Sequence, residues 1–103
     1  MYFVYMAQCR DGSLYTGITD DVARRIMEHN SGRGAKYTRG RGPLRLCYVE
    51  ETESRGSALR REREIKALRR ADKLLLAERC RQASEHADFG GEGMDFAVPV
   101  LQK

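Results

Sequence analysis

The chain has 103 residues, of which 41% are hydrophobic and 33% charged, enough for one small domain. The longest unbroken apolar run ends at Ala7. It is too short to span a membrane and lacks the basic start and cleavage site of a secretory signal, so we expect an intracellular, cytoplasmic protein. The three cysteines, Cys9, Cys47 and Cys80, match no zinc-ligand spacing, and we expect them to be free thiols.

The positive charge is concentrated in the first four fifths of the chain. Residues 1–82 hold 18 Lys and Arg against 11 Asp and Glu, whereas residues 83–103 hold one Lys and four acidic residues. Most of the basic residues are arginines, whose guanidinium groups can contact phosphate with two parallel hydrogen bonds. This excess is typical of a domain that binds a polyanion such as nucleic acid.

Strand and helix signals alternate along residues 1–82. Strands are predicted at residues 2–8, 14–18 and 44–49, and helices from a cap at Thr19 or Asp20 to about Asn30, over 54–69 and over 72–82. Residues 31–43 have the glycines and cations of a loop that lies along a nucleic-acid backbone. The order ββαβαα predicts an α+β domain over residues 1–82, followed by an acidic, glycine-containing tail, residues 83–103, that we expect to be largely disordered.

The first predicted helix places a cation and an imidazole beside its apolar face. At 100° per residue, the expected core face holds Val22, Ala23, Ile26 and Met27. Arg25 and His29 lie four residues apart on the boundary of that face. They are either an arginine that snorkels over a surface histidine or a functional pair.

Glu62 interrupts the apolar face of the second predicted helix. It shares that face with Ala58 and Ile65, at positions i, i+4 and i+7. A carboxylate on such a face needs a partner, because burying an unpaired charge is costly. Two partners stay open: one of the many arginines, or a metal ion near phosphate-binding arginines.

These residues together resemble the GIY-YIG nuclease superfamily, and most closely its small, stand-alone, single-domain bacterial branch. The resemblance rests on an ordered set of motifs over residues 2–82: Phe3-Val4-Tyr5, Tyr15-Thr16-Gly17, Arg25, His29 and Glu62. Two positions depart from the pattern, since Phe3 replaces the first glycine and Thr16 replaces the isoleucine of the second triplet.

The resemblance implies a three-stranded antiparallel sheet flanked by helices, with the active site on one face of the sheet. It implies that Glu62 holds one divalent metal ion, Mg²⁺ or Mn²⁺, and that Arg25 contacts the scissile phosphate. Tyr5 and Tyr15 would line the site, one of them activating or orienting the attacking water. His29 matches a polar position of the site.

The resulting prediction is a metal-dependent nuclease that cleaves branched, damaged or single-stranded DNA in repair or recombination, with RNA as a second candidate substrate. A protein partner that targets the enzyme to its substrate is compatible with this prediction. The cations expected to contact the nucleic acid lie on the first helix, in the loop and at the start of the third strand: Arg24, Arg33, Lys36, Arg39, Arg41 and Arg45.

Two alternatives stay open. The chain is small for an enzyme that carries a separate DNA-binding domain, so it could be a module that keeps the fold and binds nucleic acid without cleaving it. Such a module would show steeply salt-dependent binding and no products. Alternatively, residues 95–100 of the tail could dock on a protein partner or pack back on the domain.

Overall fold

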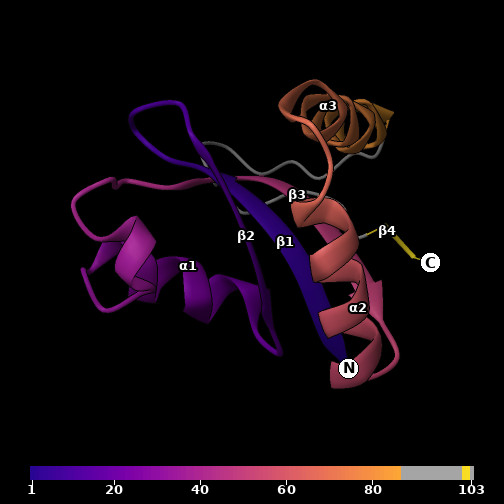
Figure 1. Cartoon of the computed structure of the whole chain (residues 1–103), viewed down its shortest axis with the longest axis horizontal. Helices are drawn as coiled ribbons and strands as arrows, with labels where there is room; N and C mark the ends of the chain where they lie inside the picture. The colour runs from indigo at the N-terminus through magenta and orange to yellow at the C-terminus, as the bar shows by residue number, and fades with distance from the viewer. Residues whose placement is uncertain (87–100, 103) are drawn as a thin grey trace.

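A computed structural model describes residues 1–86 and 101–102 of the chain. The elements are β1 (Tyr2–Gln8), β2 (Leu14–Thr19), α1 (Val22–Asn30), the short 3₁₀ helix η1 (Lys36–Thr38), β3 (Arg45–Thr52), α2 (Arg55–Lys66), α3 (Arg70–His86) and β4 (Leu101–Gln102). The predicted ββαβαα order and the α+β class are confirmed (Figure 1).

The sheet has the strand order β2-β1-β3-β4, and β1 pairs antiparallel with both β2 and β3. These are the three antiparallel strands that the resemblance implied. The two residues of β4 pair in parallel with Glu50 and Glu51 of β3 and form one edge of the sheet. The tail segment 95–100, which was expected to dock or pack back, lies outside the described residues.

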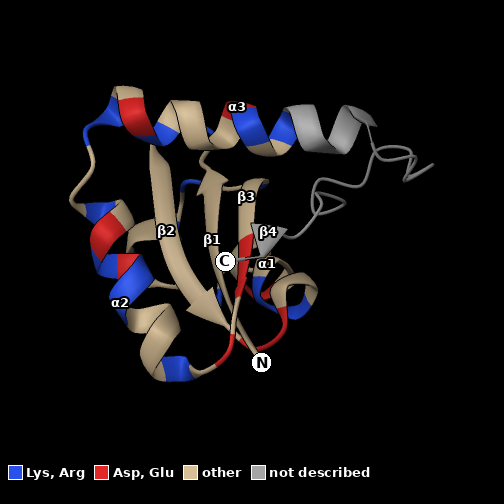
Figure 2. Cartoon of the chain, turned by 90° about the vertical axis from the view of Figure 1, so that its right-hand side faces the viewer, with Lys and Arg blue, Asp and Glu red and all other residues tan. Residues whose placement is uncertain are grey.

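Two apolar layers cover the two faces of the sheet. Because side chains alternate along a strand, Tyr5 faces the α1 side and packs near Ile26. Val4 and Met6 face the opposite side, where Ala58 and other residues of α2 and α3 cover them. Figure 1 shows α1 and α2 on opposite sides of the sheet, and Figure 2 shows α3 running across the strands.

An irregularity in β3 changes which of its side chains face each layer. Met6 pairs with Tyr48 but Ala7 pairs with Leu46, so Cys47 is the extra residue of a β-bulge. Leu46 therefore packs in the α1 layer, whereas Tyr48 packs in the layer under α2 and α3. Without the bulge, these two side chains would point to the same face.

The predicted helix boundaries need two corrections. Asp21, not Thr19 or Asp20, caps α1, because its carboxylate accepts a hydrogen bond from the backbone N–H of Arg24 at 3.0 Å. Thr19 stays in the sheet, where it pairs with Phe3. The last helix runs from Arg70 to His86 and is therefore longer than predicted at both ends.

The predicted core face of α1 is partly wrong. Met27 is 66% exposed, whereas Ile26 and His29 are both 2% exposed. The rotation of α1 therefore buries a histidine where apolar spacing favoured a methionine. The structure assigns no disulfide to Cys9, Cys47 or Cys80. No helix of the described residues is long and apolar enough to cross a membrane.

Candidate active site

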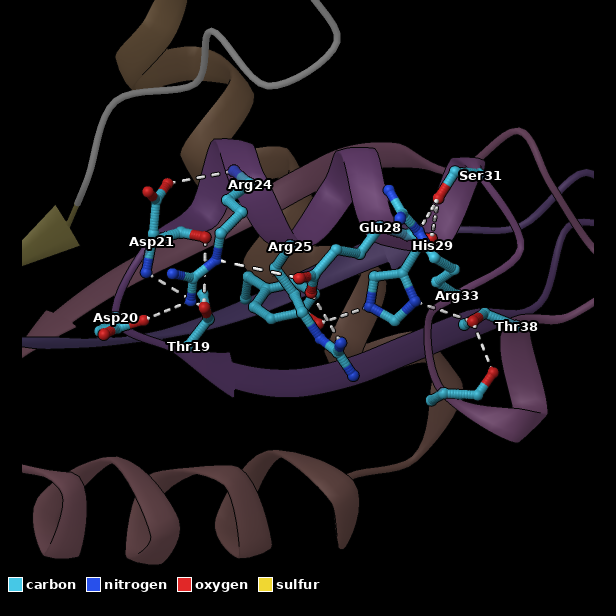
Figure 3. Close-up of polar contacts among 12 residues, drawn as sticks. Thr19, Asp20, Asp21, Arg24, Arg25, Glu28, His29, Ser31, Arg33 and Thr38 are labelled. Carbon is cyan, nitrogen blue, oxygen red and sulfur yellow. Dashed lines mark hydrogen bonds and ion pairs between the residues drawn. The ribbon is translucent and has the colours of Figure 1, made fainter.

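A chain of hydrogen bonds links β1, α1 and η1 in the α1 layer. The Tyr5 hydroxyl lies 2.8 Å from Nε2 of His29. Nδ1 of His29 lies 2.8 Å from the hydroxyl oxygen of Thr38, which donates to the carbonyl of Ala35 at 2.9 Å. Figure 3 shows the His29 ring between the sheet and Thr38. This burial excludes the interpretation of His29 as a surface residue.

The direction of the hydrogen bonds fixes the tautomer of His29. The single hydroxyl proton of Thr38 is used for Ala35, so the Thr38 oxygen must accept from Nδ1–H of His29. Nε2 is then the unprotonated nitrogen, and it accepts the hydroxyl proton of Tyr5. The site therefore holds a neutral imidazole with one lone pair directed at a phenol.

Burial keeps the Tyr5–His29 pair uncharged. Desolvation raises the pKa of Tyr5 above its ordinary value, and the nearby Tyr15 raises it further. The charge of Arg25 opposes this shift. Desolvation, helped by the charge of Arg25, lowers the pKa of His29 to about 4. At neutral pH the proton between the two side chains therefore belongs to Tyr5.

Arg25 extends from α1 beside this pair (Figure 3). Its guanidinium donates to the Glu28 carboxylate at 3.0 Å, and its side chain is 29% exposed. The hydrogen bond to Glu28 raises the pKa of Arg25 further, and the two phenols of Tyr5 and Tyr15 act in the same direction. The site thus holds a fixed positive charge that solvent can reach.

Tyr15 connects the buried pair to the protein surface. Its ring lies 5.2 Å from the His29 ring and 6.0 Å from the ring of Tyr37, measured between centroids. Tyr37 is 44% exposed, and the guanidinium carbon of Arg41 lies over its ring, 4.4 Å from the ring centroid. The aromatic rings therefore form a continuous path from His29 to solvent.

Two glycines make this packing possible. A Cβ atom on Gly17 would lie 2.8 Å from the Tyr5 hydroxyl oxygen and 3.0 Å from the Tyr15 ring. A Cβ atom on Gly34 would lie 2.1 Å from Nδ1 of His29. Both positions therefore require glycine because the aromatic rings lie against the backbone.

Glu62 approaches the site from α2. Its neighbours on the helix face, Ala58 and Ile65, are fully buried as predicted, whereas the Glu62 side chain is 17% exposed. Its charge raises the pKa of Tyr5, and its carboxylate pairs with the ammonium group of Lys66 at 3.4 Å. Among the described residues the partner of Glu62 is thus a lysine and not the predicted arginine, and the Lys66 side chain is 55% exposed and can move away. The metal ion stays a prediction.

The donor set around Glu62 fits magnesium. Among the described residues, no group of three or more His, Cys, Asp or Glu could enclose a metal ion. Mg²⁺ is commonly held by one or two carboxylates, with water and substrate phosphate as its other ligands. One partly exposed carboxylate, close enough to Tyr5 to raise its pKa, fits that coordination, so Glu62 is the residue that would hold the ion.

An open cleft of about 300 Å³ lies beside Tyr15. Residues from four elements line it: Leu14, Tyr15 and Thr16 of β2, Tyr37 of η1, Lys66 of α2 and Lys73 of α3. The cleft thus places two ammonium groups next to a tyrosine of the site. Neither lysine was among the predicted nucleic-acid contacts.

The predicted nucleic-acid contacts do not form one cluster. Arg41 lies nearest to the site, over Tyr37, and pairs with Asp11 at 2.5 Å. Arg24 is tied to Asp20 at 2.8 Å on the exposed side of α1, and Arg45 lines a different cavity of about 390 Å³. The other three are exposed in the loop before β3: Arg33, Lys36 and Arg39.

Sequence comparison finds proteins that are similar to this chain. The profile of the GIY-YIG catalytic domain matches residues 1–74. The chain is 54% identical over 77 residues to a UPF0213 protein of Haloquadratum walsbyi, covering 75% of this chain and 86% of that protein. It is 52% identical over 75 residues to a UPF0213 protein of Staphylococcus aureus, covering 73% of this chain and 92% of that protein.

A solved structure is also similar. The solution NMR structure of a UPF0213 protein from Bacillus halodurans is 52% identical, covers 76% of this chain and 84% of its own, and superposes with a TM-score of 0.49. The profile match spans the strands, helices and side chains described above, from β1 to the start of α3. The chain belongs to the GIY-YIG family, whose catalytic domain is a nuclease domain.

Proposed function

We propose that this chain is a metal-dependent nuclease that hydrolyses phosphodiester bonds in DNA. Branched, damaged or single-stranded DNA is the proposed substrate, and repair or recombination the proposed setting. The observation that carries the proposal is the hydrogen-bonded Tyr5–His29 pair, with Arg25 beside it and Glu62 close enough to influence the Tyr5 pKa.

Arg25 would bind the scissile phosphate. A guanidinium group stays charged at every physiological pH and presents two parallel donors to phosphate oxygens. Its ion pair with Glu28 positions it before substrate arrives, so little reorganisation is needed when negative charge develops in the transition state.

Tyr5 and His29 would move the proton of the attacking water. As the water oxygen bonds to phosphorus, one water proton passes to the Tyr5 oxygen and the Tyr5 proton passes to Nε2 of His29. Nδ1–H stays bonded to Thr38 throughout, so the imidazole is oriented to receive that proton. Because burial disfavours the free phenolate, we propose that the two transfers occur together.

Glu62 would hold the divalent ion, Mg²⁺ or Mn²⁺. When bound, such an ion supplies positive charge to phosphate oxygens and to the leaving oxygen. Lys66, which neutralises Glu62 in this structure, would turn away from the carboxylate. Tyr15, which lines the neighbouring cleft, would form part of the wall of the site.

The test is cleavage of a panel of labelled substrates by the wild type and Glu62→Gln, with Mg²⁺, Mn²⁺ or EDTA. The panel holds single-stranded, duplex, flap and four-way-junction DNA and one RNA. We expect metal-dependent products from the wild type and a loss on the order of 100-fold or more in the variant. Tight binding without products from the wild type would contradict a nuclease and favour the non-catalytic binding module.

A further inference from the structure

We infer that the cleft beside Tyr15 is a nucleotide subsite next to the scissile bond, in which Lys66 and Lys73 bind a backbone phosphate and Tyr37 stacks on an unpaired base. This inference rests on the proposed function and adds the substrate feature that the cleft recognises. The two lysines of the subsite belong to α2 and α3, whereas the predicted contacts Arg33, Lys36 and Arg39 lie between α1 and β3.

The two lysines reach the cleft from different helices. Lys66 is the last residue of α2 and Lys73 lies in the first turn of α3, so the short connection between the helices brings both to one wall. Converging ammonium groups repel one another unless an anion lies between them. A phosphate group supplies that charge and accepts hydrogen bonds from both.

Lys66 is paired with Glu62 in the structure and can exchange this partner for a phosphate. Its ammonium group lies 3.4 Å from the carboxylate that would hold the metal ion. The Lys66 side chain is 55% exposed, so its ammonium group can turn from this carboxylate to a phosphate in the cleft without a metal ion. Lys73 makes no ion pair with any residue in the described part of the chain, so its charge is available to a ligand.

Tyr37 gives the cleft an aromatic wall. Its ring is stacked at 24° on Tyr15, and the Arg41 guanidinium lies over it. Tyr37 is 44% exposed and lines the cleft, so it offers an aromatic surface of the kind on which unpaired bases stack. A base inside a duplex is already stacked, so this surface favours single-stranded DNA, flaps and gaps over continuous duplex.

The test is equilibrium binding of a labelled single-stranded oligonucleotide of about 12 nucleotides in EDTA, where no cleavage occurs. The double variant Lys66→Gln/Lys73→Gln is compared with Arg63→Gln/Arg79→Gln, which removes the same charge from exposed positions of the same two helices. We expect the slope of log K against log salt to fall by about 0.7, the value for one phosphate contact, in the first and much less in the second. Equal slopes in the two double variants would overturn the phosphate site.

The stacking of Tyr37 on an unpaired base is tested with Tyr37→Ala and Tyr37→Phe, with thermal melting to confirm folding. Tyr37→Ala should weaken single-strand binding about tenfold, leave duplex binding near the wild-type value, and be rescued by Phe. Equal loss on single strand and duplex would overturn base stacking. These binding measurements contain no metal and involve no cleavage, so they test the subsite separately from the proposed function. The subsite can be refuted although Glu62→Gln abolishes cleavage, and it can be supported although the wild type proves inactive.

Discussion

The hydroxyl of Tyr5 on the central strand lies 2.8 Å from Nε2 of His29 on the first helix, and it donates its proton to that nitrogen. The direction is set by Thr38, which occupies the other ring nitrogen. A buried phenol bonded to a neutral imidazole is a proton relay in its resting state. Several measurable consequences follow from this arrangement.

The stability of the wild type should depend on pH through His29. Its folded pKa is about 4, below the value near 6.5 of an exposed histidine, so between these values the unfolded chain binds more protons. The free energy of unfolding should therefore be highest above about pH 6.5 and fall by up to about 3 kcal/mol as the pH drops to about 4. Urea unfolding at several pH values measures this free energy. His29→Gln should abolish most of this dependence, whereas His86→Gln should retain it, and parallel profiles for all three proteins would exclude His29 as the cause.

Thr38 should hold the tautomer of His29. Thr38→Val removes the acceptor of Nδ1–H and leaves a buried donor unpaired, at a cost of about 1 to 3 kcal/mol in unfolding free energy. Thr38→Ser keeps the hydroxyl and should retain most of the stability. Nitrogen-15 NMR of the imidazole reports the tautomer directly. A protonated Nε2 in the wild type would show that the direction of the hydrogen bonds is the reverse of that described here.

Gly17 should be intolerant of even one methyl group. Gly17→Ala places a carbon against the Tyr5 hydroxyl and the Tyr15 ring, so both must move, and we expect a loss of about 1 to 3 kcal/mol together with most cleavage activity. Gly56→Ala is the matched control, because its Cβ would meet only the Ser54 hydroxyl oxygen, at an ordinary van der Waals distance of 3.9 Å, in the first turn of α2. That variant should be as stable as the wild type or more stable by up to about 1 kcal/mol. Similar behaviour of the two variants would contradict the close packing at Gly17.

Glu50 is the carboxylate most easily mistaken for the metal ligand. It is 4% exposed, accepts hydrogen bonds from Tyr48 and Arg61, and has one oxygen without a hydrogen-bond partner among the described residues. Glu50→Gln removes a charge-assisted bond to Arg61 and should reduce stability by about 1 to 3 kcal/mol. Cleavage should stay near the wild-type rate at a temperature where the variant is folded. A folded Glu50→Gln protein that had lost cleavage would assign the acidic role to Glu50 instead of Glu62.

Local patterns predicted the fold well, because the elements are short and their connections are signalled by turn residues. The strand signals at residues 2–8 and 14–18 predicted β1 and β2, and the i, i+4, i+7 spacing placed Glu62 on a largely buried face. Spacing failed for α1, where Met27 is exposed and His29 is buried. A hydropathy pattern ranks histidine below methionine and cannot register that both ring nitrogens of His29 have partners.

The site could be predicted only where its residues lie within recognisable motifs. Thr38 and Gly34 contact His29 across a loop, and no local pattern indicates which loop residue returns to which helix. Lys66 and Lys73 meet because of the angle between two helices, which depends on packing under both. The roles assigned to Tyr5, Tyr15, Arg25, His29 and Glu62 stay predictions.

The most direct test of the proposed site is the single-turnover cleavage rate of Tyr5→Phe, measured on the preferred substrate with saturating Mg²⁺. This variant removes one hydroxyl group and leaves the ring in place. Tyr48→Phe is the control, since Tyr48 is equally buried but lies on the opposite face of the sheet. We predict that Tyr5→Phe reduces the rate about 100-fold or more, while Tyr48→Phe stays within about threefold of the wild type. A Tyr5→Phe rate equal to that of the wild type would contradict the proton relay.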